Sequence, residues 1–154
     1  MESIVKQVGN NTYVFWVKYV DCRDGFSHTC ELYKNGYRIN SNRVHYINRT
    51  WESYRFQSVM LGCVRNEMEY VLNSGLTQFK EQNGIKRLVK EKREKVVDAI
   101  KNSAEYAELQ MLYDMVKDAQ YGTEAEKERL ETLDKMLKMT EALASLGFFG
   151  HKAV

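Results

Sequence analysis

The stretch FSHTCELYKNGYRINSNRVHY, residues 26–46, decides the fold. Asn35-Gly36 at its centre is the strongest short-range signal for a β-hairpin, because both central positions of a type I′ turn need a positive φ. We expect a bulge at residues 40–42 that returns Val44 and Tyr46 to the core face and turns Arg43 and His45 outward. The turn predicts three cross-strand pairs, which are Lys34 with Tyr37, Tyr33 with Arg38, and Leu32 with Ile39.

Two more strands are expected before this hairpin, at residues 3–8 and 12–20, with a turn at residues 9–11 between them. Residues 12–20 are mostly β-branched and aromatic, as is typical of strands. This segment has apolar side chains on both faces, Phe15 on one and Val14 and Trp16 on the other. We therefore predict a central strand that is covered on each side.

After about residue 50 the apolar residues recur with the period of a helix. Asn48 or Thr50 is the expected N-cap, and residues 73–75 are the expected end. The arc expected to lie on the sheet holds Phe56, Val59, Met60, Cys63, Val64 and Val71. The opposite arc holds Trp51, Tyr54, Arg55, Ser58, Gly62 and Arg65.

Three further helices are expected, at residues 85–101, 102–119 and 123–147, the last with Thr123 and Glu126 as a capping box. The last two should form an antiparallel hairpin with a coiled-coil-like seam. That seam holds Leu109, Leu112, Val116 and Ala119 on one helix and Leu130, Leu133, Leu137 and Ala144 on the other.

The predicted fold class is α+β. An N-terminal antiparallel sheet of three to four strands has one helix packed across it, and a C-terminal helical arm ends in the antiparallel hairpin. We divide the chain into a sheet-plus-helix domain at residues 1–75 and a helical arm at residues 76–154. The sequence leaves open whether the arm packs on the first domain as one unit.

The composition limits the class of protein. The chain has 154 residues, is 44% hydrophobic and 29% charged, and contains no proline and three cysteines. An odd number of cysteines at unrelated spacings argues against a disulfide-framed secreted domain. No apolar run has the length of a membrane span, and the N-terminus lacks the pattern of a signal peptide. We expect a cytoplasmic protein with no membrane contact.

The formal net charge of +2 hides an asymmetry along the chain. Residues 1–60 and 61–103 each carry a net charge of +3, whereas residues 104–154 carry −4. Such an imbalance concerns partners rather than fold. The front of the chain could bind phosphates or an acidic protein, and the acidic hairpin could dock on a basic groove or join two copies into a homodimer.

The first candidate site is an aromatic and basic segment between residues 33 and 65. Arginine with tryptophan and tyrosine is typical of protein–protein hot spots and also of nucleic-acid surfaces. The predicted partner contacts are Arg38, Arg43, Arg49, Trp51, Tyr54 and Arg55. The competing interpretation buries Trp51 and Tyr54 under the C-terminal arm, with Ser58 and Gly62 allowing close helix approach.

The second candidate site is the run from Lys86 to Lys95, which has six positive and two negative residues. Such a helix face can follow a phosphate backbone. Glu91 with Lys95 and Lys90 with Glu94 are spaced i,i+4, so a simple solvated helix face explains the run as well. The predicted nucleic-acid contacts are Lys86, Arg87, Lys90 and Arg93.

Metal binding and catalysis have weaker support. Cys22, His28, Cys30 and His45 are types of zinc ligand, but the chain has no Cys-x-x-Cys pair. Glu67 falls inside the apolar arc of the first helix, where burial could make it a general base. No glycine-rich phosphate loop is present. We therefore expect no enzyme activity, no cofactor and no metal, and keep a small hydrolase or metal protein as the third alternative.

Residues 47–58, INRTWESYRFQS, resemble a segment of small accessory proteins of bacteriophages and mobile elements. The resemblance implies a phage context in the host-cell cytoplasm, where small non-enzymatic inhibitors of host defence, including anti-CRISPR proteins, are common. It carries no residue roles. The leading hypothesis is a small binding protein whose partner is a host protein or nucleoprotein, and the alternative is a protein that binds nucleic acid directly.

Overall fold

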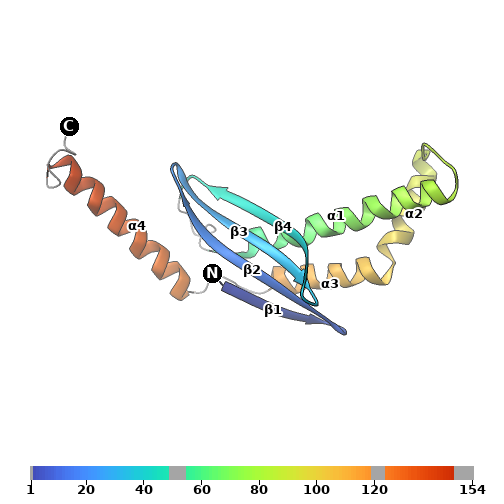
Figure 1. The fold of residues 1–154 in the computed structure, drawn as a ribbon, viewed down its shortest axis with the longest axis horizontal. Coiled ribbons are helices and arrows are strands. Elements are labelled where there is room, and N and C mark those ends of the chain that lie inside the picture. Colours follow the sequence, from blue (N-terminus) through green and yellow to red (C-terminus); the bar gives the residue numbers. More distant parts are fainter. Residues whose placement is uncertain (1, 49–54, 119–123, 148–154) are drawn as a thin grey trace.

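The computed structural model describes residues 2–48, 55–118 and 124–147. Four antiparallel strands form one sheet in the order β1-β2-β3-β4 (Figure 1). Their bounds are Glu2–Val8, Asn11–Cys22, Gly25–Lys34 and Tyr37–Tyr46. The Asn-Gly turn has the expected backbone, with positive φ of 50° at Asn35 and 88° at Gly36. The strands predicted at residues 3–8 and 12–20 are confirmed within two residues at each end, and the predicted hairpin forms β3 and β4.

The predicted β-bulge lies in a different place. Tyr33 pairs with Arg38 and Lys34 with Tyr37, as expected, but Leu32 pairs with Asn40 and leaves Ile39 as the extra residue. The extra residue lets the Ile39 side chain pack against the core while the strand continues in register. Val44 and Tyr46 are thereby on the core face, as predicted, opposite His28 and Phe26.

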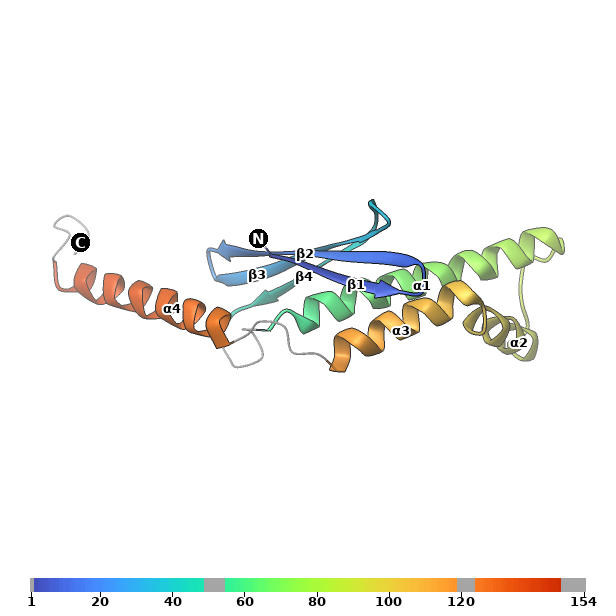
Figure 2. The same cartoon turned by 90° about the horizontal axis from the view of Figure 1, so that it is seen from below.

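Four helices follow the sheet: α1 (Gln57–Gln82), α2 (Lys90–Lys101), α3 (Ala104–Asp118) and α4 (Glu124–Ser145). Figure 2 shows α1 and α3 on one side of the sheet and no described helix on the other. The core lies between the sheet and these two helices. Its fully buried members include Phe15, Val17, Leu32, Val59, Met60, Val64, Leu109 and Leu112. Among the described residues, the expected cover on the second face of β2 is absent.

Both ends of α1 differ from the prediction. The N-cap position is Phe56, whose side chain is buried and makes no capping hydrogen bond. Of the two predicted caps, Thr50 lies outside the described residues and Asn48 precedes the helix by nine positions. The helix also continues seven residues beyond Gly75, because Leu76 is buried and Gly75 lies against Ile100 of α2. Packing against α2 therefore outweighs the local stop signal.

Gly62 faces the sheet rather than the C-terminal arm. It is buried, and a Cβ atom built on it would lie 1.9 Å from Nδ2 of Asn42 on β4. That amide donates a hydrogen bond of 3.2 Å to the carbonyl of Val59. The absence of a side chain at Gly62 thus lets α1 approach β4 closely.

We expect Gly62→Ala to destabilise the fold by about 1–3 kcal/mol, because the methyl group displaces Asn42 and breaks its hydrogen bond to the carbonyl of Val59. Chemical denaturation of both proteins measures this difference. Asn42→Ala in the Gly62→Ala background should restore part of the loss. Two losses that simply add would mean that the two residues do not interact.

The predicted hairpin of the last two helices is not confirmed. The seam residues Leu109, Leu112 and Val116 of α3 are buried in the core shared with α1. Helix α4 extends away from the sheet (Figures 1 and 2). Thr123 lies outside the described residues, so the predicted capping box does as well. None of the described helices has the length and apolar composition needed to cross a membrane.

Candidate functional site

The first predicted contact surface is only partly described. Arg38 and Arg43 lie on β4, whereas Arg49, Trp51 and Tyr54 fall outside the described residues. Arg55 is half-buried just before α1. The structure therefore places Arg38 and Arg43 on the same face of the sheet, the one that the helices leave uncovered, where they contact different partners. It does not test the competing interpretation, in which the C-terminal arm covers Trp51 and Tyr54.

The uncovered sheet face carries one aromatic residue that the sequence argument did not select. Trp16 is 41% exposed, and it pairs across the ladder with Glu31. Arg38 approaches Glu31 with a nitrogen–oxygen distance of 3.9 Å, while Arg43 donates a hydrogen bond to the sulfur of Cys22 at 3.4 Å. The alternation of side chains along β2 places Trp16 on this face. Because both faces of this strand are apolar, the sequence predicted that Trp16 would be covered.

The candidate metal ligands do not converge. His28 and Cys30 point toward the helices and are fully buried, whereas Cys22 lies on the opposite face of the sheet near Ser27. Cys63 donates to the carbonyl of Cys30, and a hydrogen bond with the Cys63 thiol, together with burial, raises the pKa of the Cys30 thiol. Within residues 2–48, 55–118 and 124–147, no group of three or more His, Cys, Asp or Glu side chains could hold a metal ion.

His28 occupies an aromatic cage instead. Its ring centroid lies 5.2 Å from that of Phe56 and 5.3 Å from that of Tyr46, both edge-on. Neither ring nitrogen has a hydrogen-bond partner among the described residues. Burial lowers the pKa of His28 from 6.5 to about 4, because the charged imidazolium loses its hydration there.

We expect His28→Phe to raise stability at neutral pH by about 1 kcal/mol, because it removes two unpaired buried nitrogens. The stability from neutral His28 is fully present above pH 6.5 and is lost as the pH falls toward about 4. The stability advantage of the variant over the wild type should therefore increase as the pH is lowered. Urea unfolding at pH 7 and pH 4.5 measures the difference, and a constant difference would contradict the role of His28.

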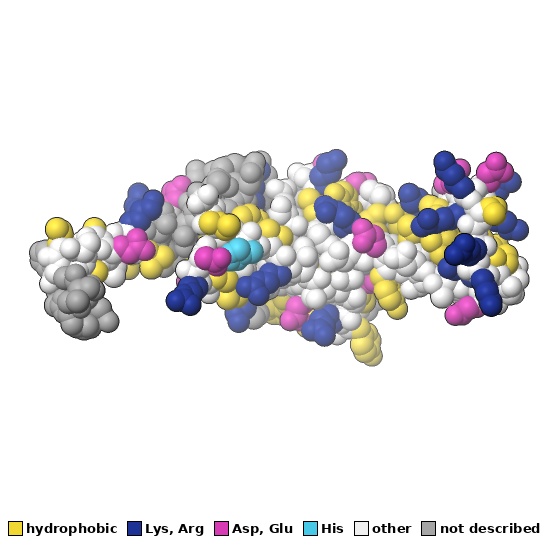
Figure 3. Space-filling view, turned by 90° about the horizontal axis from the view of Figure 1, so that it is seen from above, with side chains coloured by type: hydrophobic (Ala, Val, Ile, Leu, Met, Phe, Trp, Pro, Cys, Tyr) yellow, Lys and Arg dark blue, Asp and Glu magenta, His cyan; other side chains and the backbone are white. Residues whose placement is uncertain are grey.

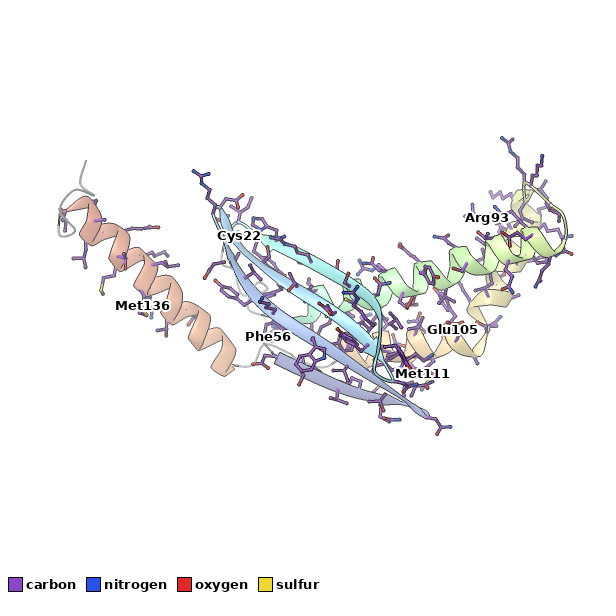
Figure 4. All side chains as sticks on the ribbon, in the orientation of Figure 1. Cys22, Phe56, Arg93, Glu105, Met111 and Met136 are labelled. Carbon is purple, nitrogen blue, oxygen red and sulfur yellow. The ribbon has the colours of Figure 1, made fainter. Side chains whose placement is uncertain are left out.

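The second predicted site forms a pocket. Lys86, Arg87 and Arg93 line a cavity of about 460 Å³ between the end of α1 and the start of α2. Figure 3 shows Lys and Arg side chains gathered over this end of the molecule, and Figure 4 labels Arg93 there. Its other lining residues are Asn73, Leu76, Thr77, Lys80 and Leu88. We call these eight residues the basic pocket.

Lys80 joins the pocket from α1, and it was missed from the sequence because five residues separate it from the basic run. Lys90 does not line the basic pocket. It lines a neighbouring cavity of about 550 Å³ together with Arg93, Glu94 and Asp98. Arg93 therefore lines both cavities, but the second cavity also contains two carboxylates, so only the basic pocket is purely cationic.

The basic pocket has no internal charge compensation. No carboxylate lines it, and its four cationic side chains make no ion pair with any described residue. The two i,i+4 ion pairs expected on α2 are not formed either, so the Lys86–Lys95 run is not neutralised along the helix. Four like charges around one cavity repel one another, and an anion placed among them lowers their energy.

No protein family, curated protein or solved structure was found to match this chain.

Glu67 lies in a different place, between the sheet and the helices α1 and α3. Burial, with a contribution from Glu105, raises its pKa from 4.5 to about 7, and Lys34 and a hydrogen bond from Asn40 lower it in part. The cavity beside Glu67 has a volume of about 40 Å³, close to that of one water molecule. A substrate would not fit in that space, so the basic pocket is the stronger candidate for ligand binding.

Proposed function

We propose that this protein binds nucleic acid through the phosphate backbone, with the basic pocket as the contact. The supporting observation is the set of four cationic side chains, Lys80, Lys86, Arg87 and Arg93, around a cavity that no carboxylate lines. Phosphate contacts from Lys and Arg supply most of the affinity of non-specific nucleic-acid binding.

The proposed binding is independent of base sequence. Lys and Arg contacts to phosphates position a nucleic acid but carry no sequence information. The remaining polar residues of the basic pocket, Asn73 and Thr77, are short side chains on α1 that can donate to phosphate oxygens. Lys90 lies outside the basic pocket, in a neighbouring cavity that Glu94 and Asp98 also line, and is not part of the proposed contact.

Fluorescence anisotropy with labelled duplex and single-stranded DNA of about 20 nucleotides tests the proposal. We expect dissociation constants in the micromolar range at about 50 mM salt, which rise at least about tenfold at 200 mM salt. Unrelated sequences of equal length should bind equally well. Absence of binding at about 50 mM salt would refute the proposal.

A second candidate is the hypothesis of a small phage-type inhibitor that binds a host protein or nucleoprotein, for example one of a CRISPR–Cas system. The supporting observation is the uncovered face of the sheet, where Trp16 is exposed on β2 and β4 carries Arg38 and Arg43 on the same face. An apolar centre with a charged rim is the arrangement found in protein interfaces. Neither proposal requires catalysis or a cofactor, and both place the protein in the host-cell cytoplasm.

Competition separates the two candidates. Heparin, a polyanion, should displace DNA from the basic pocket, whereas it should leave a protein held at Trp16 in place. For the second candidate, Trp16→Ala should abolish capture of a purified host complex after nuclease treatment, and Tyr37→Ala, which alters another exposed aromatic residue, should not. Capture that survives Trp16→Ala would exclude the sheet face.

A further inference from the structure

Helix α4 has a broad apolar face with no partner among the described residues. Three of its large side chains are widely exposed, Met136 at 59%, Leu137 at 48% and Met139 at 65%. Met136 is labelled in Figure 4, where α4 lies apart from the side chains of the sheet and of α1–α3. An apolar helix face of this kind usually packs against another surface.

A groove that suits a helix lies at the other end of the molecule. It has a volume of about 680 Å³ and runs between α1 and α2. Its α1 wall extends from Tyr70 to Gln82, which is about 18 Å of helix. The floor is mainly apolar and includes Val71, Gly75, Phe79, Val96, Ala99 and Ile100. The absence of a side chain at Gly75 lets Ile100 of α2 lie directly against α1, because a Cβ atom at this position would be 2.7 Å from Cδ1 of Ile100.

The charges of the two surfaces are complementary. Lys92 and Lys95 of α2 line the groove, against one carboxylate, Glu105. Helix α4 carries six acidic and four basic residues. Its 22 residues span about 33 Å, so the helix is long enough to fill the groove from end to end.

We propose that α4 of one copy docks in the α1–α2 groove of a second copy, and that the exchange is reciprocal. Figure 1 shows α4 at one end of the molecule and α2, which forms one wall of the groove, at the other end, with the sheet between them. When two copies are related by a two-fold axis and lie antiparallel, α4 of each copy reaches the groove of the other. Both apolar surfaces, the α4 face and the groove, are then buried. Exchange of an identical element between copies is a common route to a dimer.

The apolar residues that were predicted to join α3 and α4 fit this arrangement. In a simple hairpin α4 would pack on the apolar side of α3, but Leu109 and Leu112 of α3 already belong to the core with α1. The matching residues of α4, including Leu137, therefore need another surface. The groove between α1 and α2 supplies one.

Sedimentation velocity of the full chain, from about 1 to about 100 µM, tests the proposal. We expect a dimer of twice the 18.1 kDa chain mass. The double variant Met136→Ser/Leu137→Ser and the groove variant Ala99→Glu should each raise the dimer dissociation constant by about a hundredfold. Ala99 is exposed, so the substitution leaves the core intact.

Two matched variants serve as controls. Ala107→Glu places the same charge on an exposed position of α3 outside the groove, and Tyr37→Ser removes an exposed apolar side chain from the β3–β4 turn. Both should remain dimeric. A chain that stays monomeric at about 100 µM would overturn the proposal, including the case in which α4 folds back on its own chain. A dimer that survives both test variants would also overturn it.

Discussion

Replacing Lys86, Arg87 and Arg93 together with alanine is expected to weaken DNA binding by about two to three orders of magnitude at about 0.1 M salt. Each phosphate contact releases close to one counterion when the protein binds, so the loss of one contact lowers the binding constant nearly tenfold at that salt concentration. The three side chains line one cavity and make no ion pair with a described residue. Anisotropy titration with one labelled duplex measures the loss.

The matched control removes the same charge elsewhere. Arg65, Lys117 and Lys135 are exposed and lie outside the basic pocket. Their triple alanine variant lowers the net charge equally, so it accounts for the general attraction between a basic protein and DNA. An equal loss in both triple variants would show that charge alone, and not the pocket, carries binding. Circular dichroism should confirm that both variants fold.

Glu67→Gln is expected to stabilise the protein by roughly 1–3 kcal/mol at pH 8. The folded state holds a proton on Glu67 up to about pH 7, while the unfolded chain releases it near pH 4.5. The contribution of this raised pKa to stability is therefore fully present below pH 4.5 and is lost as the pH rises toward 7. Glutamine keeps the shape of the protonated side chain and avoids the buried charge.

Urea unfolding of the two proteins at pH 4.5 and pH 8 measures this effect. The difference between wild type and variant should be near zero at the lower pH and largest at the higher one. Glu69→Gln is the control, because Glu69 is exposed two positions further along the same helix. A gain of equal size at both pH values would mean that Glu67 titrates normally. In that case the ionisation of Glu67 would have no effect on stability.

The sheet could be predicted from local signals. Alternation and the Asn-Gly turn specify strands and register over short distances, and all four strands were located in this way. Residues 40–42 break the alternation, which predicts the bulge there. In the structure Ile39 is the extra residue, and its side chain packs against the core. A choice between neighbouring bulge positions depends on packing, which the sequence pattern does not contain.

The helical half was less predictable for the same reason. The end of α1 at Gln82 depends on Leu76 and on contact with α2, which outweigh the stop signal at residues 73–75. The seam of α3 was correctly identified as apolar, but its partner is α1 rather than α4. An amphipathic helix shows which face it buries and does not show which element it meets.

The candidate site was predictable in part. Lys86, Arg87 and Arg93 were selected from a run of like charge, and the structure groups them in one cavity. Lys80 could not be selected, since only the return of the chain from α1 to α2 brings it there. Trp16 could have been selected from the alternation of side chains along β2. It was not, because both faces of this strand are apolar and the sequence predicted that both would be buried. The structure leaves one of these faces uncovered among the described residues.

The salt dependence of DNA binding tests the central claim most directly. The logarithm of the binding constant should fall linearly with the logarithm of salt concentration, with a slope near −0.9 per phosphate contact on a duplex. For the Lys86/Arg87/Arg93 variant we predict a slope that is smaller in magnitude by about 2.7 than that of the wild type. Equal slopes for the two proteins would contradict the assignment of the basic pocket as the phosphate contact.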